Sequence, residues 1–146
     1  MARRTIILLG QPVYNEDGAA GEAIKPGHLV QGVTTILKHA TAGGKTPTAF
    51  ALERDELGRG IDDTLNVGHG SADYAIGDTV KVGVFTKGQR VLAFIASGQN
   101  ITADMQLESA GNGTLRTLAA GQVLARALES SGGAVVTLTR IRVEIM

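Results

Sequence analysis

The sequence predicts an all-β protein, and three features of it lead to that prediction. Glycine supplies 20 of the 146 residues, about twice its usual share of roughly 7%. The glycines are dispersed among runs rich in valine and isoleucine, as expected for short strands joined by tight turns. Residues 135–145 alternate apolar with polar side chains, which is typical of a strand with one buried face.

The length and composition indicate a domain that can build its own core. A chain of this size buries about 68–70% of the surface that its unfolded state exposes. Aromatic residues make up only 3% of the chain and tryptophan is absent, so the core must consist mainly of Val, Ile, Leu and Ala. There is no cysteine, which excludes disulfides, thiolate metal sites and cysteine nucleophiles.

Two regions are expected from the distribution of apolar residues. Residues 1–25 hold one short apolar run followed by a polar, glycine-rich stretch, and we expect them to form an extended N-terminal arm. Residues 26–146 are expected to form a single domain resembling a small β-barrel or β-tulip. A long segment without periodicity, residues 53–73, is predicted to be a loop within that domain.

Individual strands and turns can be placed along the second region. Strands are expected at residues 28–33, 34–37, 48–52, 79–85, 90–96, 105–109, 114–118 and 135–145. Turns are expected at residues 41–47, 86–89, 97–100 and 110–113, and Lys87-Gly88 predicts that the second of these closes a hairpin. Residues 122–129 have helical propensity, so they could form one short helix or a further strand.

The charge balance argues against several partners. Fourteen basic and fourteen acidic residues give a net charge of zero, and no basic stripe suits a nucleic acid backbone. No run reaches the roughly 18 apolar residues of a membrane-spanning helix. The apolar run at residues 5–10 is too short for a signal peptide, so we expect a protein made in the cytoplasm. Near-zero net charge favours self-association.

The residue patterns give little support to an enzyme. The three histidines have no partners at metal-ligand spacing, and the acidic residues of the 53–73 loop lack the alternation of a calcium loop. Residues 43–46 read Gly-Gly-Lys-Thr, but a phosphate-binding loop would need glycine where His39 stands, and Pro47 blocks the helix that should follow. We therefore expect no catalytic site, no metal and no cofactor.

Two alternative functions remain open at this point. Lys87 lies at the tip of the predicted hairpin, where biotinyl and lipoyl carrier domains display a modifiable lysine, although Thr86 and Gly88 are not the usual flanking residues. The other alternative is a small β-barrel ligand-binding domain whose site lies in the 53–73 loop.

Several motifs, taken together and in order, resemble the decoration (cement) proteins of tailed-phage capsids. An I-x-P-G-x-L-V motif stands at residues 24–30, and Y-x-x-G-D-x-V stands at residues 74–80. They are followed by S-G-x-x-I at residues 97–101, A-x-A-L-E at residues 125–129 and the final strand. The resemblance covers about residues 20–146, except residues 53–72.

This resemblance implies a structural role in a virion. A decoration protein binds the outer surface of the expanded phage head, bridges subunits of the major capsid protein and stabilises the shell against the pressure of packaged DNA. The family is often trimeric, so a homotrimer is expected. The implied location is the outer capsid surface, after synthesis in the host cytoplasm, and the implied partners include no nucleic acid and no membrane.

Candidate contact residues follow from this picture. The arm is expected to bind the capsid by adding a strand to a partner sheet. Its β-prone residues are Thr5, Ile6, Ile7, Leu8 and Leu9. Contacts between subunits are expected from charged residues of the long loop, namely Arg54, Arg59, Asp62 and Asp63.

Overall fold

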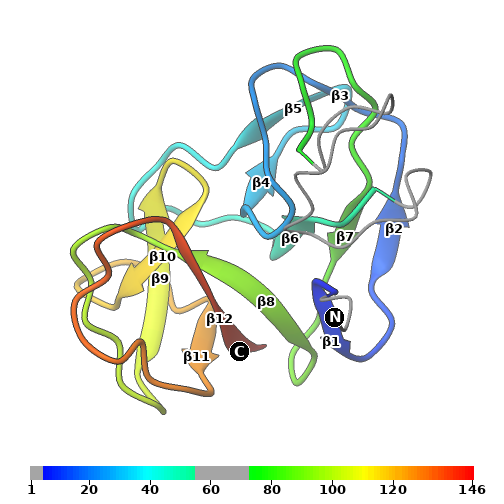
Figure 1. Ribbon diagram of the computed structural model, residues 1–146. Helices are drawn as coiled ribbons and strands as arrows, with labels where there is room; N and C mark the ends of the chain where they lie inside the picture. Colours follow the sequence, from blue (N-terminus) through cyan, green and yellow to red (C-terminus); the bar gives the residue numbers. More distant parts are fainter. Residues whose placement is uncertain (1–4, 55–72) are drawn as a thin grey trace, which may run out of the picture.

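The computed structural model describes residues 5–54 and 73–146, and it is all-β. Twelve strands form in this part of the chain, and no α-helix occurs in it. The predicted fold class is confirmed. The strands form one group containing β1 and β8–β12 and a second group containing β2–β7, which lie side by side in Figure 1.

The C-terminal strands close into a small barrel. In sequence order the barrel strands are β8 (Arg90–Ile95), β9 (Gln106–Gly111), β10 (Thr114–Thr117), β11 (Ala125–Ala127) and β12 (Thr139–Ile145). Their spatial order is β8-β10-β9-β11-β12, and β12 pairs again with β8, which closes the ring. All contacts are antiparallel except that between β10 and β8.

Local chemistry explains two of these elements. In β12 the side chains of Ile141, Val143 and Ile145 are buried, and the residues between them face outward, as the alternation predicts. The β9–β10 turn has positive φ at both Asn112 (55°) and Gly113 (74°), the conformation that a tight hairpin requires and that Asn-Gly favours.

The structure shortens the last predicted strand, and of the two alternatives left open for residues 122–129 it shows the strand. Strand β12 begins at Thr139 rather than at residue 135, because Val135 exchanges backbone hydrogen bonds with Gly98 and Gln99 instead of continuing the barrel strand. Residues 122–129 form no helix. Their middle is strand β11, because Ala125 and Ala127 pack into the barrel with no exposed surface.

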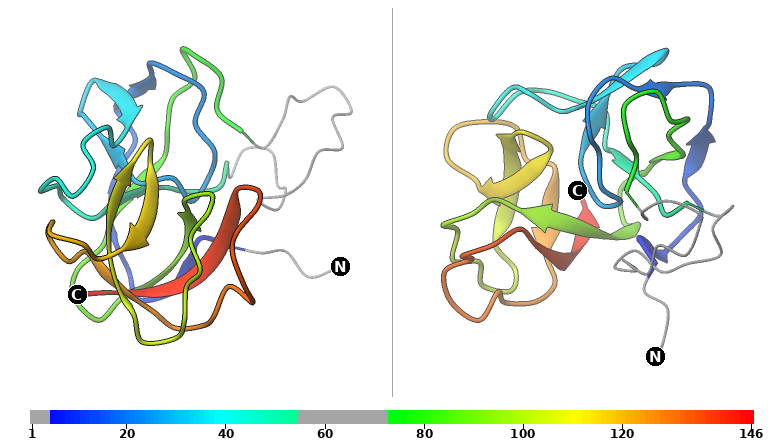
Figure 2. Two further views of the ribbon diagram at one scale, coloured as in Figure 1. Left: turned by 90° about the vertical axis from the view of Figure 1, so that its left-hand side faces the viewer. Right: turned by 45° about the horizontal axis from the view of Figure 1, so that its top comes forward.

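The other strands form two three-stranded sheets. One has the order β2-β7-β6, from β2 (Val13–Asn15), β7 (Val82–Val84) and β6 (Ala49–Ala51). The second has the order β3-β5-β4, from β3 (Ala19–Ala20), β5 (Thr35–Lys38) and β4 (Val30–Gln31). In the left view of Figure 2, β3 and β5 lie at the top of the molecule, and β12 runs across its lower half.

The N-terminal segment is not a separate arm over its described residues, which corrects the expectation for residues 5–25. Strand β1 (Ile7–Leu9) pairs with β8, β2 pairs with β7, and β3 pairs with β5. Ile6 is fully buried in the barrel cluster, and its carbonyl accepts a hydrogen bond from Leu92. The apolar run at residues 6–9 finds its partner in β8, far along the chain, so local sequence could not reveal it.

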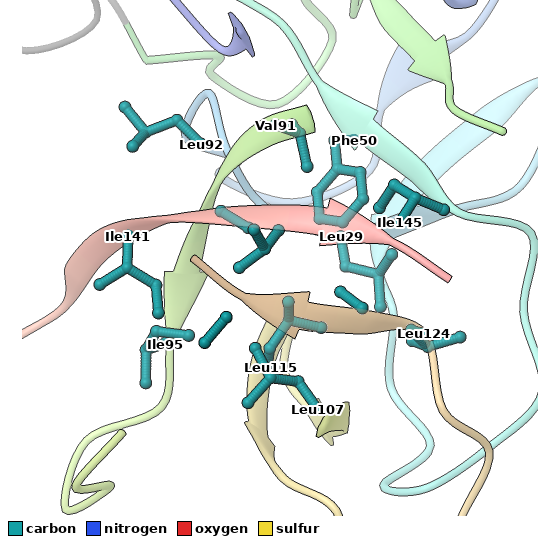
Figure 3. Packing of buried hydrophobic residues seen from close by; sticks show 14 of the residues in the cluster. Leu29, Phe50, Val91, Leu92, Ile95, Leu107, Leu115, Leu124, Ile141 and Ile145 are labelled. Atoms are coloured by element: carbon teal, nitrogen blue, oxygen red, sulfur yellow. The ribbon is translucent and has the colours of Figure 1, made fainter. Parts of the chain in front are cut away.

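Two apolar clusters hold the molecule together. The larger fills the barrel and includes Leu29 and Phe50, which come from the second group of strands and lie beside Val91 and Ile145 in Figure 3. The smaller cluster lies within the second group, around Ile24, Tyr74 and Val80 among others. Because Leu29 and Phe50 belong to the barrel cluster, the second group of strands contributes part of the core of the barrel.

Ile6→Ala should therefore destabilise the fold by about 2–5 kcal/mol, since it removes a buried aliphatic side chain and leaves a cavity. Leu9→Ala is the matched control, because Leu9 is 52% exposed in the same segment. Urea unfolding monitored by circular dichroism measures both. Equal midpoints for the two variants would show that residues 5–9 do not belong to the core.

Candidate functional site

The clearest candidate for a binding surface is an apolar edge, by which we mean Leu8, Leu9, Val13 and Tyr14 on β1 and β2. These side chains are 39%, 52%, 69% and 51% exposed, respectively. Both strands lie at the ends of their sheets in the described part of the chain. Exposed apolar side chains on strands with an open edge are typical of protein–protein contact surfaces.

The structure divides the five residues predicted to contact a capsid. Ile6 is buried and Ile7 is half-buried against the barrel core, so these two support the fold. Thr5, Leu8 and Leu9 are exposed, and the Thr5 hydroxyl donates to the carbonyl of Ile7 at 3.0 Å. Of the predicted set, Leu8 and Leu9 offer apolar surface to a partner. Val13 and Tyr14 were missed, because two adjacent apolar residues are too short a run to indicate a binding surface.

Of the predicted inter-subunit residues, only Arg54 lies in the described part of the chain. Its guanidinium is 3.0 Å from the Asp78 carboxylate, donates to the carbonyl of Asp73 at 3.2 Å and lies over the ring of Tyr74. Arg54 therefore has partners within its own chain. Arg59, Asp62 and Asp63 lie outside the described residues, so their contacts stay predictions.

Other large apolar side chains of the described residues are exposed in two groups away from this edge, and Met146 is exposed at the C-terminus. Val33 and Ile76 lie in two turns that flank β3. Residue 34, next to Val33, and residues 77–79, which follow Ile76, form backbone hydrogen bonds or a bridge with β3. Val136 and Leu138 lie just before β12. Turn residues carry no periodic signal, so the sequence did not single them out.

A turn at residues 25–28 joins the second group of strands to the barrel. The Gly27 carbonyl accepts from the N–H of Phe94, and the Pro26 carbonyl accepts from Nε of Arg140 at 2.9 Å. The rings of His28 and Phe94 lie 4.7 Å apart, and the Arg140 guanidinium lies 4.2 Å from the Phe94 ring centre. These contacts fasten the I-x-P-G-x-L-V motif onto β8 and β12.

His28 is held neutral in this turn. The N–H of Lys25 donates to its Nδ1 at 3.0 Å, so the ring's proton must be on Nε2. Burial, followed by the charges of Lys38, Arg140 and Lys25, lowers the pKa of His28 from its ordinary 6.5 to about 3. This histidine therefore serves as a hydrogen-bond acceptor and packing partner near neutral pH.

A buried carboxylate fixes the neighbouring loops. The Glu108 side chain has no exposed surface, and it accepts from Nε of Arg116 at 2.8 Å and from the N–H of Gly121 at 2.6 Å. Burial alone would raise the pKa of Glu108, but these hydrogen bonds and the Arg116 charge outweigh it, and the pKa lies below its ordinary value. Sequence pattern alone does not indicate this role, because Glu108 is one polar residue in an ordinary strand.

Near it, His39 and Ser109 form a buried pair. Nδ1 of His39 lies 2.7 Å from Oγ of Ser109, which also accepts from the N–H of Gly111 at 3.2 Å. Burial lowers the pKa of His39. Ser109 has no exposed surface, so its hydroxyl does not face an open site, and the pair joins the end of β5 to β9.

Lys87 is exposed in a tight turn, but this turn does not close a hairpin, which corrects the prediction. Strand β7 before it pairs with β2 and β6, whereas β8 after it pairs with β1, β10 and β12. Gly88 has the positive φ of a turn (90°). The chain reverses at this turn as expected, but it passes from one sheet to another. Lys87 therefore does not lie at the tip of a β-hairpin, as the modified lysine of a carrier domain does.

Within residues 5–54 and 73–146, no three His, Asp or Glu side chains gather as a metal site would require. The same residues contain no helix long and apolar enough to cross a membrane.

Comparison with known proteins gives a similarity at the level of structure. No protein-family model matches the sequence, and no curated protein matches it. Among solved structures, the chain is similar to the N base of head fiber gp8.5 in bacteriophage phi29, with a TM-score of 0.56 and 16% identity. The match covers 88% of this chain and 90% of that chain, and at this identity it shows a shared fold.

The buried, neutral His28 predicts acid sensitivity. Its pKa is about 3 when folded and near 6.5 when unfolded, so the unfolded chain takes up the proton first as the pH falls. The free energy of unfolding should drop by up to about 1.4 kcal/mol per pH unit on this account, between roughly pH 6.5 and pH 3.

His28→Asn keeps an acceptor for the Lys25 N–H but cannot take up a proton near neutral pH. Urea unfolding at pH 6.5 and pH 4.5 should show the parent losing about 2–3 kcal/mol more than the variant. An identical pH dependence for both proteins would contradict a neutral His28.

Proposed function

We propose that this protein is a structural component of a phage head that binds the outer surface of the expanded shell as a decoration protein. The observation that supports this most is the shared fold with the phi29 head fiber base over 88% of the chain. The ordered motifs at residues 24–30, 74–80 and 97–101 support it independently. The motifs are a property of the sequence, whereas the fold similarity is a property of the backbone.

The proposed mechanism is mechanical. A protein that binds only the assembled, expanded shell stabilises that state by its binding free energy. Many copies on one shell let modest affinities act together. The proposed partner is the major capsid protein, whose subunits this protein would bridge, and the trimer implied by the resemblance would match a local three-fold axis. The proposed location is the outer capsid surface.

The β1 part of the apolar edge, Leu8 and Leu9, supplies a surface for this contact. Leu8 and Leu9 project from the described N-terminal segment, while Ile6 anchors that segment to the barrel. A segment fixed in this way loses little conformational entropy when a partner binds it, compared with a free arm.

Purified protein should co-sediment with expanded, undecorated phage shells and reach saturation at a fixed number of copies per shell. Unexpanded shells serve as the control, since the proposed partner surface forms on expansion. Absence of binding to expanded shells from every phage tested, including the one whose genome encodes this chain, would overturn the proposal.

Leu8→Asp combined with Leu9→Asp should lower the affinity for shells at least tenfold while leaving the melting temperature within a few degrees. Val136→Asp is the matched control, because Val136 is 84% exposed and lies outside the apolar edge. If the Val136 variant loses binding and the double variant does not, the contact lies elsewhere on the surface.

A further inference from the structure

Among residues 5–54 and 73–146, no strand pairs with the outer edge of β2, which leaves that edge open for hydrogen bonding in the described structure. The N–H of Leu52 donates to the carbonyl of Lys81, and the N–H of Phe85 donates to the carbonyl of Thr48. Backbone groups of every second residue point to the same side of a strand, so those of Gly83, which lies midway between Lys81 and Phe85, also face β6. Val82 and Val84 must then face β2, where their partners are Asn15 and Val13. Because alternate residues of a strand bond to opposite sides, the N–H and C=O of Tyr14 point away from the sheet.

Apolar side chains accompany this open edge. Val13 and Tyr14 are more than half exposed, and the ammonium of Lys81 lies 5.1 Å from the centre of the Tyr14 ring. A partner strand placed along β2 would cover both side chains and satisfy the outward backbone groups of Tyr14.

The two ends of β2 carry opposite charges. Glu16 and Asp17 follow the strand and are exposed. At its other end, the turn containing exposed Lys87 lies against the preceding residues, since Nε2 of Gln89 donates to the carbonyl of Gln11 at 3.0 Å. In the described part of the chain, neither acid is in an ion pair, and neither is the lysine.

We propose that β2 is a self-association edge, at which a second copy of this chain pairs antiparallel across a two-fold axis, with Tyr14 opposite Tyr14 of the second copy. Reversal of the strand places each Lys87 turn beside Glu16 and Asp17 of the other copy, so the charge pattern is complementary to itself. The β6-β7-β2 sheets of two copies would join into one continuous sheet. This goes beyond the proposed function and does not depend on it.

Pro12 limits the length of this ladder. It has no N–H, so beyond the Tyr14 pair only its carbonyl can take part, accepting from the N–H of Glu16 of the second copy. The contact is therefore short, and it should form at high protein concentration or when copies are held close together. The same proline prevents longer strand addition that would lead to aggregation.

The absence of cysteine permits a direct test with single-cysteine variants of the full chain. Directly opposed residues of a hydrogen-bonded antiparallel pair have Cα atoms about 5.5 Å apart, which suits a disulfide. Tyr14→Cys should form a covalent dimer under mild oxidation at least tenfold faster than Val136→Cys, the exposed control. Circular dichroism melting verifies that both variants fold.

Charge substitutions in the Tyr14→Cys background test the orientation. Adding Lys87→Glu should slow dimer formation severalfold, and combining it with Glu16→Lys and Asp17→Lys should restore the rate. Equal rates for Tyr14→Cys and Val136→Cys would overturn the proposal. A rate of dimer formation that does not change with any of the charge substitutions would also overturn it, because these residues would then not hold the paired strands antiparallel.

Discussion

The fold depends on strand β8, which is paired on both sides and covered on both faces. Its N–H groups and carbonyls bond to β12 on one side, and on the other to β1, to the turn at residues 25–28 and to β10. Five of its six residues are buried. Without β8 the barrel cannot close, and strand β1 loses its partner. The second group of strands would keep contacts with β9, β10 and the loop after β10, such as the His39–Ser109 pair.

Polar contacts then make this attachment specific. Apolar burial alone would let the two groups of strands slide, because the hydrophobic effect has no preferred direction. The stack of His28, Phe94 and Arg140 and the hydrogen bonds to Pro26 and Gly27 fix one arrangement. Within the barrel, buried Glu108 holds the backbone of Gly121 by accepting its N–H.

The sequence predicted what local pattern encodes. Alternation predicted most of β12, and the cluster of turn residues at 110–113 predicted the β9–β10 turn, because each is decided by neighbouring residues. Long-range pairing was not predictable in this way. The Lys87-Gly88 turn reverses the chain, but its residues do not specify that β7 and β8 join different sheets. Ile6 likewise resembles the start of a loose arm until β8 is present to cover it.

The candidate surface was predicted in part for the same reason. The apolar run at residues 6–9 was recognised, but its division into buried Ile6 and exposed Leu8 and Leu9 required the β1–β8 pairing. Val13 and Tyr14 became visible only once β2 was placed at the edge of its sheet. A barrel with an apolar edge on one side suits the proposed role of holding capsid subunits together.

Electron cryomicroscopy of expanded shells incubated with the protein tests the central claim most directly. The account predicts additional density at regular positions on the outer surface of the shell, into which the β8–β12 barrel fits, with β1 facing the shell. Shells that carry no additional density at saturating protein concentration, although the protein is folded, would contradict a role at the phage head surface.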